Sequence, residues 1–209
     1  MSFLKIVLLL ILAYLIGSFP TGVLVGNLFF HKDIRQYGSG NPGTTNAFRV
    51  FGPKAGSFVL VIDVLKGTLA SQLPIWCHLG PHQLVLAFGV AAILGHSFSI
   101  FLNFHGGKAV ATSAGVLLGY SLPFFLVCAA IFLPMLALTS MVSVASLISV
   151  VLILIASFFF HDLYLTGIMI GITLLLFIRH QSNIKRLENH HENMIPFGVY
   201  YWYRQKHHK

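Results

Sequence analysis

Charged residues are scarce in this chain of 209 amino acids. Only 9% of the residues are Asp, Glu, Lys or Arg, whereas soluble domains carry about 25%. Hydrophobic residues make up 56% of the sequence, and the mean hydropathy is +0.84. A soluble fold of this size has too little polar surface to cover so much apolar surface. The composition therefore excludes an ordinary soluble protein and predicts a single all-α membrane domain over residues 1–209.

Acidic residues and cysteines are especially few, which limits the kinds of site that the chain can build. It has five acidic residues and two cysteines, Cys77 and Cys128. Five dispersed carboxylates do not suggest a metal cage, and cysteines within apolar stretches predict buried side chains rather than a disulfide. The motifs G-x-S-x-G and H-E-x-x-H, paired-Cys metal spacing and a His–Asp pair five positions apart are also missing. We therefore expect a site without metal or cofactor.

Long apolar segments are abundant, and each is a candidate for a membrane-spanning helix of roughly 20 residues. The clear candidates are residues 3–29, 56–76, 84–102, 142–160 and 163–178. A further stretch, 109–138, is too long for one ordinary span and is interrupted by Ser121 and Pro123. We divide it into a short helix at 109–120 and a full one at 122–138. The pattern predicts a polytopic bundle with seven crossings, or a re-entrant hairpin with the same parity.

The basic residues favour this count. With seven crossings and the N-terminus outside, residues 31–54, 103–108, 139–143 and 179–209 lie in the cytoplasm, where basic residues are enriched in membrane proteins. Of the 13 Lys and Arg residues, 11 then lie on that side: Lys32, Arg35, Arg49, Lys54, Lys108, Arg179, Lys185, Arg186, Arg204, Lys206 and Lys209. A single crossing at 109–138 would place the basic C-terminal segment outside. We predict that these cytoplasmic segments form the functional face.

The first cytoplasmic loop crowds glycines, hydroxyls, amides and arginines into residues 33–49. Glycine allows close backbone approach, and successive N–H groups in such a loop can bind an anion. An arginine can add a bidentate phosphate contact. The pattern favours phosphate binding by Gly38, Ser39, Gly40, Asn41, Thr45, Asn46 and Arg49. A flexible polar loop is the alternative that this segment leaves open.

A second polar segment, Gly106-Gly107-Lys108, stands directly before a predicted helix start. Backbone N–H groups and the helix dipole favour an anion there, and the lysine adds a full charge. It is not a nucleotide-binding P-loop, because Ala109 occupies the position of the required hydroxyl. A loop with a lysine that reaches the membrane surface explains the same residues equally well. His96 is a weaker candidate, because a Gly-His pair can simply cap a helix end.

Three further features complete the candidates. A basic run follows the last apolar segment; such runs mostly fix topology and contact headgroups, but His180 and Asn183 within it share a helix face. Asp63 and Lys66 lie three residues apart inside a predicted span, where ionisable residues are functional candidates or structural ion pairs. Ser143 opens the segment 142–160, where hydroxyls often serve helix packing.

At these positions the sequence resembles the bacterial acyl-phosphate-dependent glycerol-3-phosphate acyltransferases. The shared motifs follow one order along nearly the whole chain: 17–22 (G-S-F-P-T-G), 38–46 (G-S-G-N-P-G-T-T-N) with Arg49, 63–67 (D-V-L-K-G), Gly95-His96, 106–112 (G-G-K-A-V-A-T), and 178–187 (I-R-H-Q-S-N-I-K-R-L) with Glu192. The chain departs from the family in three places. Ala109 replaces a common glycine, Ser140-Met141 replaces a frequent Arg-Tyr pair and its phosphate contact, and the tail 200–209 has no assigned role.

The resemblance implies a seven-helix protein of the bacterial cell membrane, with its site facing the cytoplasm. The implied reaction transfers an acyl group from acyl phosphate to the sn-1 hydroxyl of glycerol 3-phosphate. It gives lysophosphatidic acid and phosphate, the first step of phospholipid synthesis. Membrane lipids surround the protein, and neither a cofactor, a nucleic acid nor an obligatory protein partner is implied. In the family the substrate phosphate, rather than a protein base, is taken to accept the proton.

The resemblance also assigns roles to residues. Those expected around the phosphates are Ser39, Arg49, Lys108, Ser143, His180 and Asn183, with Gly106 and Gly107 permitting close approach. Supporting roles fall to Asp63, Lys66, His96, Arg186 and Glu192. A transporter for an organic phosphate or another anion is the alternative function, because ionisable residues within a span and glycine-broken segments suit it. Against it, the charge gathers on one face and no inverted repeat is visible.

Overall fold

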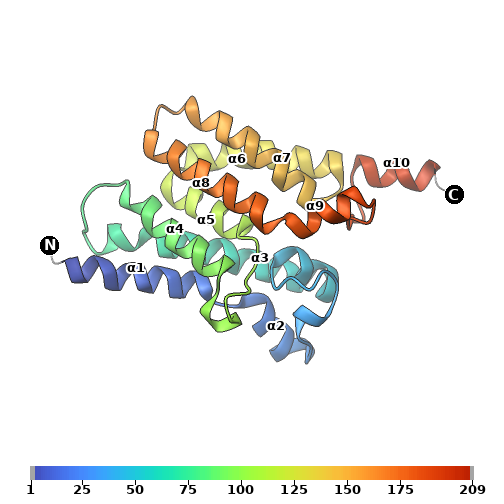
Figure 1. Cartoon of the computed structure of the whole chain (residues 1–209), viewed down its shortest axis with the longest axis horizontal. Helices are drawn as coiled ribbons and strands as arrows, with labels where there is room; N and C mark the ends of the chain where they lie inside the picture. The colour runs from blue at the N-terminus through green and yellow to red at the C-terminus, as the bar shows by residue number, and fades with distance from the viewer. Residues whose placement is uncertain (1–2, 208–209) are drawn as a thin grey trace. The chain divides into compact units, whose positions relative to one another are not determined.

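The computed structural model of the chain describes residues 3–207. Within this range every regular element is a helix and no β-strand occurs, which confirms the predicted all-α class. The chain divides into two compact units, Met1–Leu122 and Pro123–Lys209, whose elements are labelled in Figure 1. The single domain expected from the sequence stays a prediction, and each unit is described by itself.

The first unit contains five α-helices and two single turns of 3-10 helix. They are α1 (Phe3–Ser18), α2 (Thr21–Phe30), η1 (Ile34–Gln36), α3 (Thr44–Trp76), α4 (Leu84–Ser97), η2 (Ile100–Leu102) and α5 (Val110–Tyr120). Helix α3 packs against α4 and α5, while α1 packs against α4 and α3 (Figure 1). The predicted segment 3–29 is therefore two helices, bent by 43° where Phe19 and Pro20 interrupt the hydrogen-bonded ladder.

Helix α3 is folded back on itself at Gly52. This residue has φ 83° and ψ −179°, a conformation that essentially only glycine adopts. The short helix of residues 44–51 lies back along the longer part of α3. A hydrogen bond between the two parts shows this: Thr44 Oγ1 donates to Asp63 Oδ2 at 3.0 Å. Gly56 leaves room for Phe48 in the same contact. The prediction that a span begins at residue 56 identified the longer part and missed the helix before it.

Glycines set the closest helix contacts of this unit. A Cβ atom on Gly17 would collide with the backbone of Ala92, so α1 and α4 approach each other there at backbone distance. Gly67 and Gly115 do the same between α3 and α5, against the backbones of Thr112 and Val64. Small residues at helix contacts are typical of membrane proteins, where association depends on close packing rather than on hydrophobic burial.

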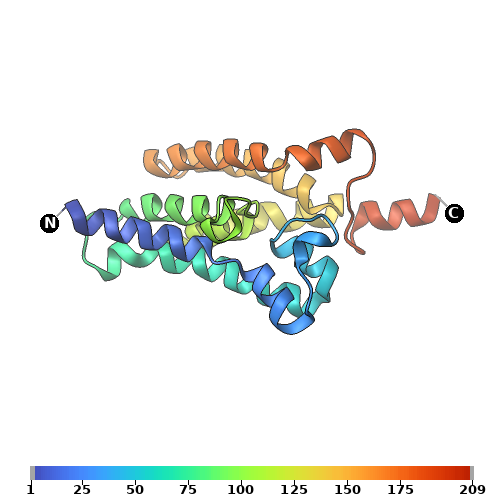
Figure 2. The ribbon, with the colours of Figure 1, turned by 60° about the horizontal axis from the view of Figure 1, so that its bottom comes forward.

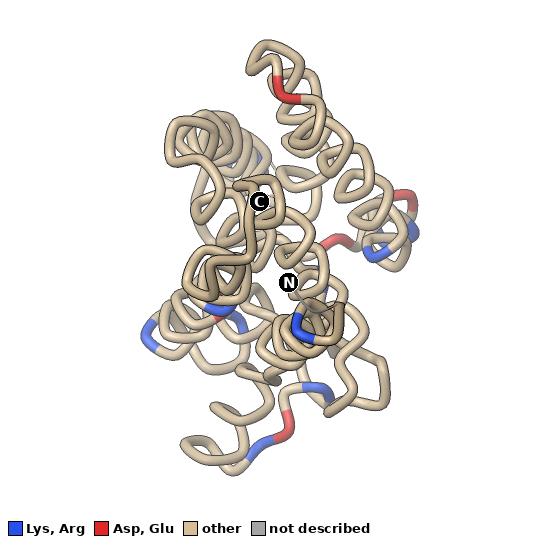
Figure 3. Tube along the Cα trace, turned by 90° about the vertical axis from the view of Figure 1, so that its left-hand side faces the viewer, with Lys and Arg blue, Asp and Glu red and all other residues tan. Residues whose placement is uncertain are grey.

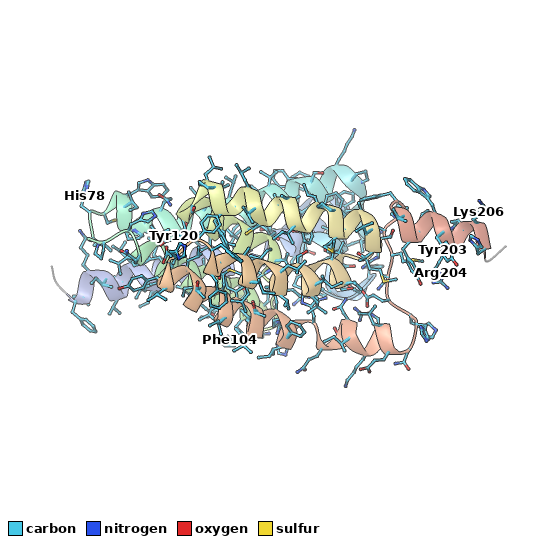
Figure 4. The ribbon with its side chains drawn as sticks, turned by 90° about the horizontal axis from the view of Figure 1, so that it is seen from above. His78, Phe104, Tyr120, Tyr203, Arg204 and Lys206 are labelled. Atoms are coloured by element: carbon cyan, nitrogen blue, oxygen red, sulfur yellow. The ribbon has the colours of Figure 1, made fainter. Side chains whose placement is uncertain are left out.

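The second unit contains α6 (Leu122–Thr139), α7 (Val142–Phe158), α8 (Leu163–Arg179), α9 (Gln181–Glu188) and α10 (Val199–His207). Asp162 caps α8 by accepting the N–H of Leu165 at 3.0 Å. Helices α8 and α9 are bent by 55° relative to each other, with His180 between them; Figure 2 shows the change of direction. The tail forms α10, which is attached where the N–H of Tyr201 donates to Ser140 Oγ at 3.0 Å; Figure 4 labels Tyr203, Arg204 and Lys206 on it.

Long apolar helices dominate both units, and Figure 3 shows how few charged residues they carry. Within residues 3–207, three helical segments are long and apolar enough to cross a membrane: Thr44–Trp76, Leu84–Leu102 and Leu122–Thr139. The bent pairs α1–α2 and α8–α9 raise this number to five, and α5 and α7 are shorter apolar helices. Large side chains such as Leu8, Leu126 and Leu174 remain more than half exposed, as contact with lipid requires. Seven crossings and the orientation of the termini stay predictions.

Candidate functional site

Asn46 organises the glycine-rich loop in front of α3. The side chain is 1% exposed. Its Nδ2 donates to the carbonyl oxygens of Tyr37 at 2.9 Å and Ile34 at 3.2 Å, and its Oδ1 accepts the N–H of Ser39 at 2.9 Å. The amide expected to bind a substrate phosphate is thus used to build the loop. Sequence alone does not reveal this role, because the partners are backbone atoms.

The loop brings Ser39 close to Arg49. Arg49 Nη1 lies 3.5 Å from Asn46 Oδ1, the same atom that accepts the Ser39 N–H. Both residues stand near the N-terminus of α3, where the helix dipole favours an anion. Gly38 and Gly40 make the turn possible with φ of 61° and 72°. Ser39 is half-buried and Arg49 is exposed, so both are accessible to a ligand.

The remaining candidates in this loop have different surroundings. Asn41 Oδ1 accepts the N–H of Gly43 at 3.0 Å, which closes a local turn. Thr45 is half-buried in the first turn of α3. Upstream, Asp33 binds the Arg35 guanidinium, with 2.7 Å between Oδ2 and Nη2. The hydrogen bond from Arg35 lowers the pKa of Asp33. The carboxylate therefore stays charged, and keeps this contact, at a lower pH than an ordinary aspartate would.

Asp63 and Lys66 form a buried ion pair in α3, with 2.8 Å between Oδ1 and Nζ. Their exposed fractions are 2% and 5%. Thr21 and Thr44 donate hydroxyl hydrogen bonds to the carboxylate at 3.1 Å and 3.0 Å, and His96 Nδ1 lies 3.9 Å from it. The two threonines were missed by the sequence reasoning, although Thr21 belongs to the motif of residues 17–22 and Thr44 to that of 38–46.

Gly106 and Gly107 fold onto the end of α4. Their N–H groups donate to the carbonyl oxygens of Ser97 at 3.1 Å and His96 at 3.0 Å. These two N–H groups were expected to cradle an anion, and the structure uses them inside the chain instead. A Cβ on Gly107 would overlap the ring of His96, so glycine is needed there for close packing.

Lys108 is half-buried and directly precedes Ala109, the residue before α5. Ala109 has φ 59° and ψ 12°, which is the left-handed conformation that favours glycine. The turn at Ala109 fixes the direction in which the chain passes from Lys108 into α5.

In the second unit, Glu192 joins three of the predicted residues. Its Oε1 accepts hydrogen bonds from Ser143 Oγ at 3.0 Å and Asn183 Nδ2 at 2.8 Å. Its Oε2 accepts from Arg186 Nε at 3.0 Å, which makes an ion pair. The carboxylate side chain is only 4% exposed. Because every contact consists of a donor facing an acceptor, Glu192 orients Ser143, Asn183 and Arg186 about one point.

His180 occupies the bend between α8 and α9 and is 2% exposed. Its Nδ1 lies 2.8 Å from the carbonyl oxygen of Leu176. A carbonyl only accepts hydrogen bonds, so Nδ1 carries the hydrogen and Nε2 is the basic nitrogen of the neutral ring. The N–H of Asn183 donates to the His180 carbonyl at 2.8 Å, which confirms that these residues lie one helical turn apart.

Among the described residues, no three His, Cys, Asp or Glu side chains gather closely enough to hold a metal ion. The structure instead presents two polar groupings with several cationic side chains. One, in the first unit, contains the Ser39–Arg49 loop, the Asp63 network and the Gly106–Lys108 segment. The other, in the second unit, contains Ser143, His180, Asn183, Arg186 and Glu192.

Comparisons with known proteins identify the family. The family described as glycerol-3-phosphate acyltransferase matches residues 7–190. Glycerol-3-phosphate acyltransferase 2 of Lactobacillus johnsonii is 66% identical over 208 residues, covering 99% of this chain and 95% of that protein. Glycerol-3-phosphate acyltransferase of Latilactobacillus sakei is 54% identical over 202 residues, covering 97% and 98%.

Two crystal structures of PlsY (YgiH), described as an integral membrane glycerol 3-phosphate acyltransferase, have the same fold. The glycerol 3-phosphate form is 32% identical with a TM-score of 0.84, covering 91% of this chain and 96% of that one. The lysophosphatidic acid form is 30% identical with a TM-score of 0.80, covering 91% and 95%. The protein is thus an integral membrane protein with bacterial relatives, and the chain belongs to the glycerol-3-phosphate acyltransferase family.

Proposed function

We propose that this protein transfers an acyl group from acyl phosphate to the sn-1 hydroxyl of glycerol 3-phosphate. The observation that carries the proposal is the meeting of Ser39 and Arg49 at one atom of Asn46, beside the N-terminus of α3. This arrangement suits a phosphate group, because it combines a guanidinium, a hydroxyl and the positive end of a helix. Its occurrence in a chain so similar to named glycerol-3-phosphate acyltransferases supports the substrate.

The reaction needs positioning more than an added reagent. The acceptor hydroxyl attacks the acyl carbon, an ester C–O bond forms, and the bond from that carbon to the phosphate oxygen breaks. The hydroxyl proton passes to the departing phosphate, so lysophosphatidic acid and inorganic phosphate balance the two substrates. Acyl phosphate is already activated, and fixed charges that hold both phosphates supply much of the remaining catalysis.

We assign the cationic and polar residues to substrate binding. Arg49 and Lys108 hold phosphate oxygens, and Ser39 adds a hydroxyl contact. Ser143, His180 and Asn183 provide the polar contacts of the second unit. Asn46 and Glu192 keep these groups in place and do not themselves bind substrate. The donor is acyl phosphate, and neither a metal nor a cofactor takes part.

We further propose that the chain crosses the bacterial cell membrane seven times. The five candidate spans and the two shorter apolar helices α5 and α7 together make seven. An odd number of crossings with the N-terminus outside keeps the loop of residues 31–43, Lys108 and the basic C-terminal segment in the cytoplasm. The reaction therefore takes place at the cytoplasmic face, where soluble glycerol 3-phosphate is available and the acylated product enters the membrane.

The test is phosphate release by the purified protein in lipid nanodiscs, measured with palmitoyl phosphate and with or without glycerol 3-phosphate. Release that depends on the acceptor, together with lysophosphatidic acid detected by mass spectrometry, is the expected result. Palmitoyl-CoA and palmitoyl-loaded acyl carrier protein are run as rival donors, and turnover with either of them alone would refute the donor assignment. Uptake of glycerol 3-phosphate into proteoliposomes without acylation would refute the enzyme in favour of a transporter.

The site is tested by charge removal. Arg49→Ala and Lys108→Ala should each lower kcat/KM by about 100-fold or more, because each removes a charge that holds phosphate. Lys54→Ala removes an exposed basic side chain from the same predicted face, outside the glycine-rich loop and the Gly106–Lys108 segment, and serves as the matched control. Wild-type rates in both site variants would overturn the assignment.

A further inference from the structure

The Asp63 carboxylate lies between the two phosphate-directed segments of the first unit. On one side it accepts the hydroxyl of Thr44, the residue that follows the glycine-rich loop of residues 38–43. On the other side lies His96, whose carbonyl oxygen accepts the N–H of Gly107 and whose ring packs on that glycine. A small pocket confirms the proximity, since it is lined by Pro42 of the loop, by Gly107 and by Asp63.

A structural ion pair alone does not account for these contacts. Lys66 already balances the charge of Asp63 at 2.8 Å, and Lys66 also donates to the carbonyl oxygen of Phe19 at 3.2 Å, at the break between α1 and α2. The carboxylate nevertheless accepts two more hydrogen bonds, from the first residues of α2 and α3. The buried Asp63–Lys66 pair thus holds two chain breaks next to the substrate-binding segments: the one between α1 and α2, and the entry of the loop into α3.

We propose that Asp63 is a positioning residue that couples the loop of residues 38–43 to the Gly106–Lys108 segment. This inference rests on the proposed function, because it assigns the two segments to the two phosphate groups of that reaction. Asp63 itself does not touch a substrate. It sets the separation between Arg49, carried by the fold-back of α3, and Lys108, carried by the turn into α5. Displacement of reacting groups by about 1 Å can cost about 100-fold in rate.

Both oxygens of the Asp63 carboxylate accept hydrogen bonds. A substitution can therefore distinguish a structural ion pair from a positioning role. Asp63→Asn keeps the shape but leaves one acceptor oxygen, and it also leaves Lys66 without its counter-charge. The double variant Asp63→Asn with Lys66→Met removes both charges, so the cost of an uncompensated buried ion disappears. If the pair is merely structural, the double variant recovers both stability and activity. If Asp63 positions the segments, only stability recovers.

Kinetics and thermal unfolding are measured on the same nanodisc preparations. The expected result for the double variant is a melting temperature close to that of the wild type, with kcat/KM lowered by about tenfold or more. Gln72→Leu is the matched control, because Gln72 Nε2 also donates a hydrogen bond from α3, to the carbonyl oxygen of Gly119 at 2.6 Å, but remote from both segments. This control should lose stability and retain wild-type kcat/KM below its melting temperature. Recovery of full activity by the double variant would overturn the proposal.

Hydrogen exchange provides a readout that does not depend on activity. The amides of Ser39 and Gly43 report on the loop, and those of Gly106 and Gly107 report on the second segment, since all four are hydrogen-bonded in the structure. In the double variant, amide hydrogens should exchange faster in peptides from both the loop and the Gly106–Lys108 segment. Thr44→Val should also accelerate exchange at Gly106 and Gly107. Acceleration in one peptide alone would contradict the coupling. A wild-type protein that is inactive towards glycerol 3-phosphate would refute the proposed function and leave this exchange test valid.

Discussion

The Oδ1 atom of Asn46 accepts the backbone N–H of Ser39 at 2.9 Å, across a sequence separation of seven residues. The same side chain donates to the Ile34 and Tyr37 carbonyl oxygens, so one amide holds the backbone of three loop residues. Asparagine suits this position because its side chain carries both an N–H donor and a carbonyl acceptor, and the loop uses both.

The first prediction concerns Asn46→Asp. This change keeps the shape but replaces the Nδ2 donors by a carboxylate oxygen that faces two carbonyl oxygens. We expect a loss of about 2 kcal/mol or more in the free energy of unfolding and a fall in kcat/KM that is as large as for Arg49→Ala. Asn41→Ala, which removes a single turn contact, should cost less. Thermal unfolding and steady-state rates measure both effects, and a stable, active Asn46→Asp protein would contradict the role given to this amide.

The second prediction concerns Gly52→Ala. No atom lies within 4 Å of an added Cβ, so only the backbone conformation at φ 83° resists the change. We expect a cost of about 1–3 kcal/mol and reduced activity, because the helix of residues 44–51 carries Arg49. Gly80→Ala is the matched control, with φ 114° and equally open space but in a loop between α3 and α4. The control should lose some stability and keep its activity at low temperature; equal activity in both variants would argue against the fold-back as a carrier of function.

The third prediction is a gain of stability. Ala109→Gly relieves a left-handed alanine in front of α5 and should raise the free energy of unfolding by about 1 kcal/mol. Ala130→Gly gives the opposite expectation, since Ala130 is an exposed residue within α6 and glycine in a helix interior costs roughly 0.5–1 kcal/mol. Melting temperatures of the two variants should move in opposite directions. A drop for Ala109→Gly would show that the turn is not strained.

The fourth prediction concerns Glu192→Gln. The amide nitrogen of glutamine cannot accept from Arg186 Nε while its oxygen serves Ser143 and Asn183, so one charged hydrogen bond is lost. We expect a loss of about 1.5–3 kcal/mol in the free energy of unfolding. Glu188→Gln makes the same change of charge on an exposed residue of α9 and should stay within about 0.5 kcal/mol of the wild type. Similar melting temperatures for the two variants would show that Glu192 does not organise its neighbours.

Much of the fold was predictable because lipid imposes simple rules on a chain. Apolar length placed the helices at 122–138, 142–160 and 163–178 within a few residues of their observed bounds, and Ser121 marked the start of α6 correctly. The predicted segment 84–102 is α4 up to Ser97, followed by the single turn η2. The sequence contains Pro20 but does not predict the bend between α1 and α2, because a proline alone does not determine the angle between two helices. The helix of residues 44–51 was missed because it is only two turns long and directly follows a loop, residues 38–43, that is rich in glycine, asparagine and proline.

The candidate site was predictable as a set of residues and not as a set of roles. Asn46, Gly106 and Gly107 were placed around phosphate, yet their polar groups bind the chain itself. Glu192 was expected only in a supporting role, and the structure shows that its carboxylate binds Ser143, Asn183 and Arg186. The difference has one cause: hydrogen bonds between groups that lie many residues apart leave no spacing pattern in a sequence.

The fold-back of α3 has an entropic consequence. Residues 44–51 are fixed at one end by the Gly52 turn and at the other by the bond from Thr44 to Asp63. Arg49 therefore projects from a short helix whose order is established when the protein folds. A flexible loop would have to lose that conformational freedom at each encounter with a substrate, at the expense of affinity. In this protein the conformational entropy of residues 44–51 is lost once, during folding. The backbone that carries Arg49 is therefore already ordered when each turnover begins.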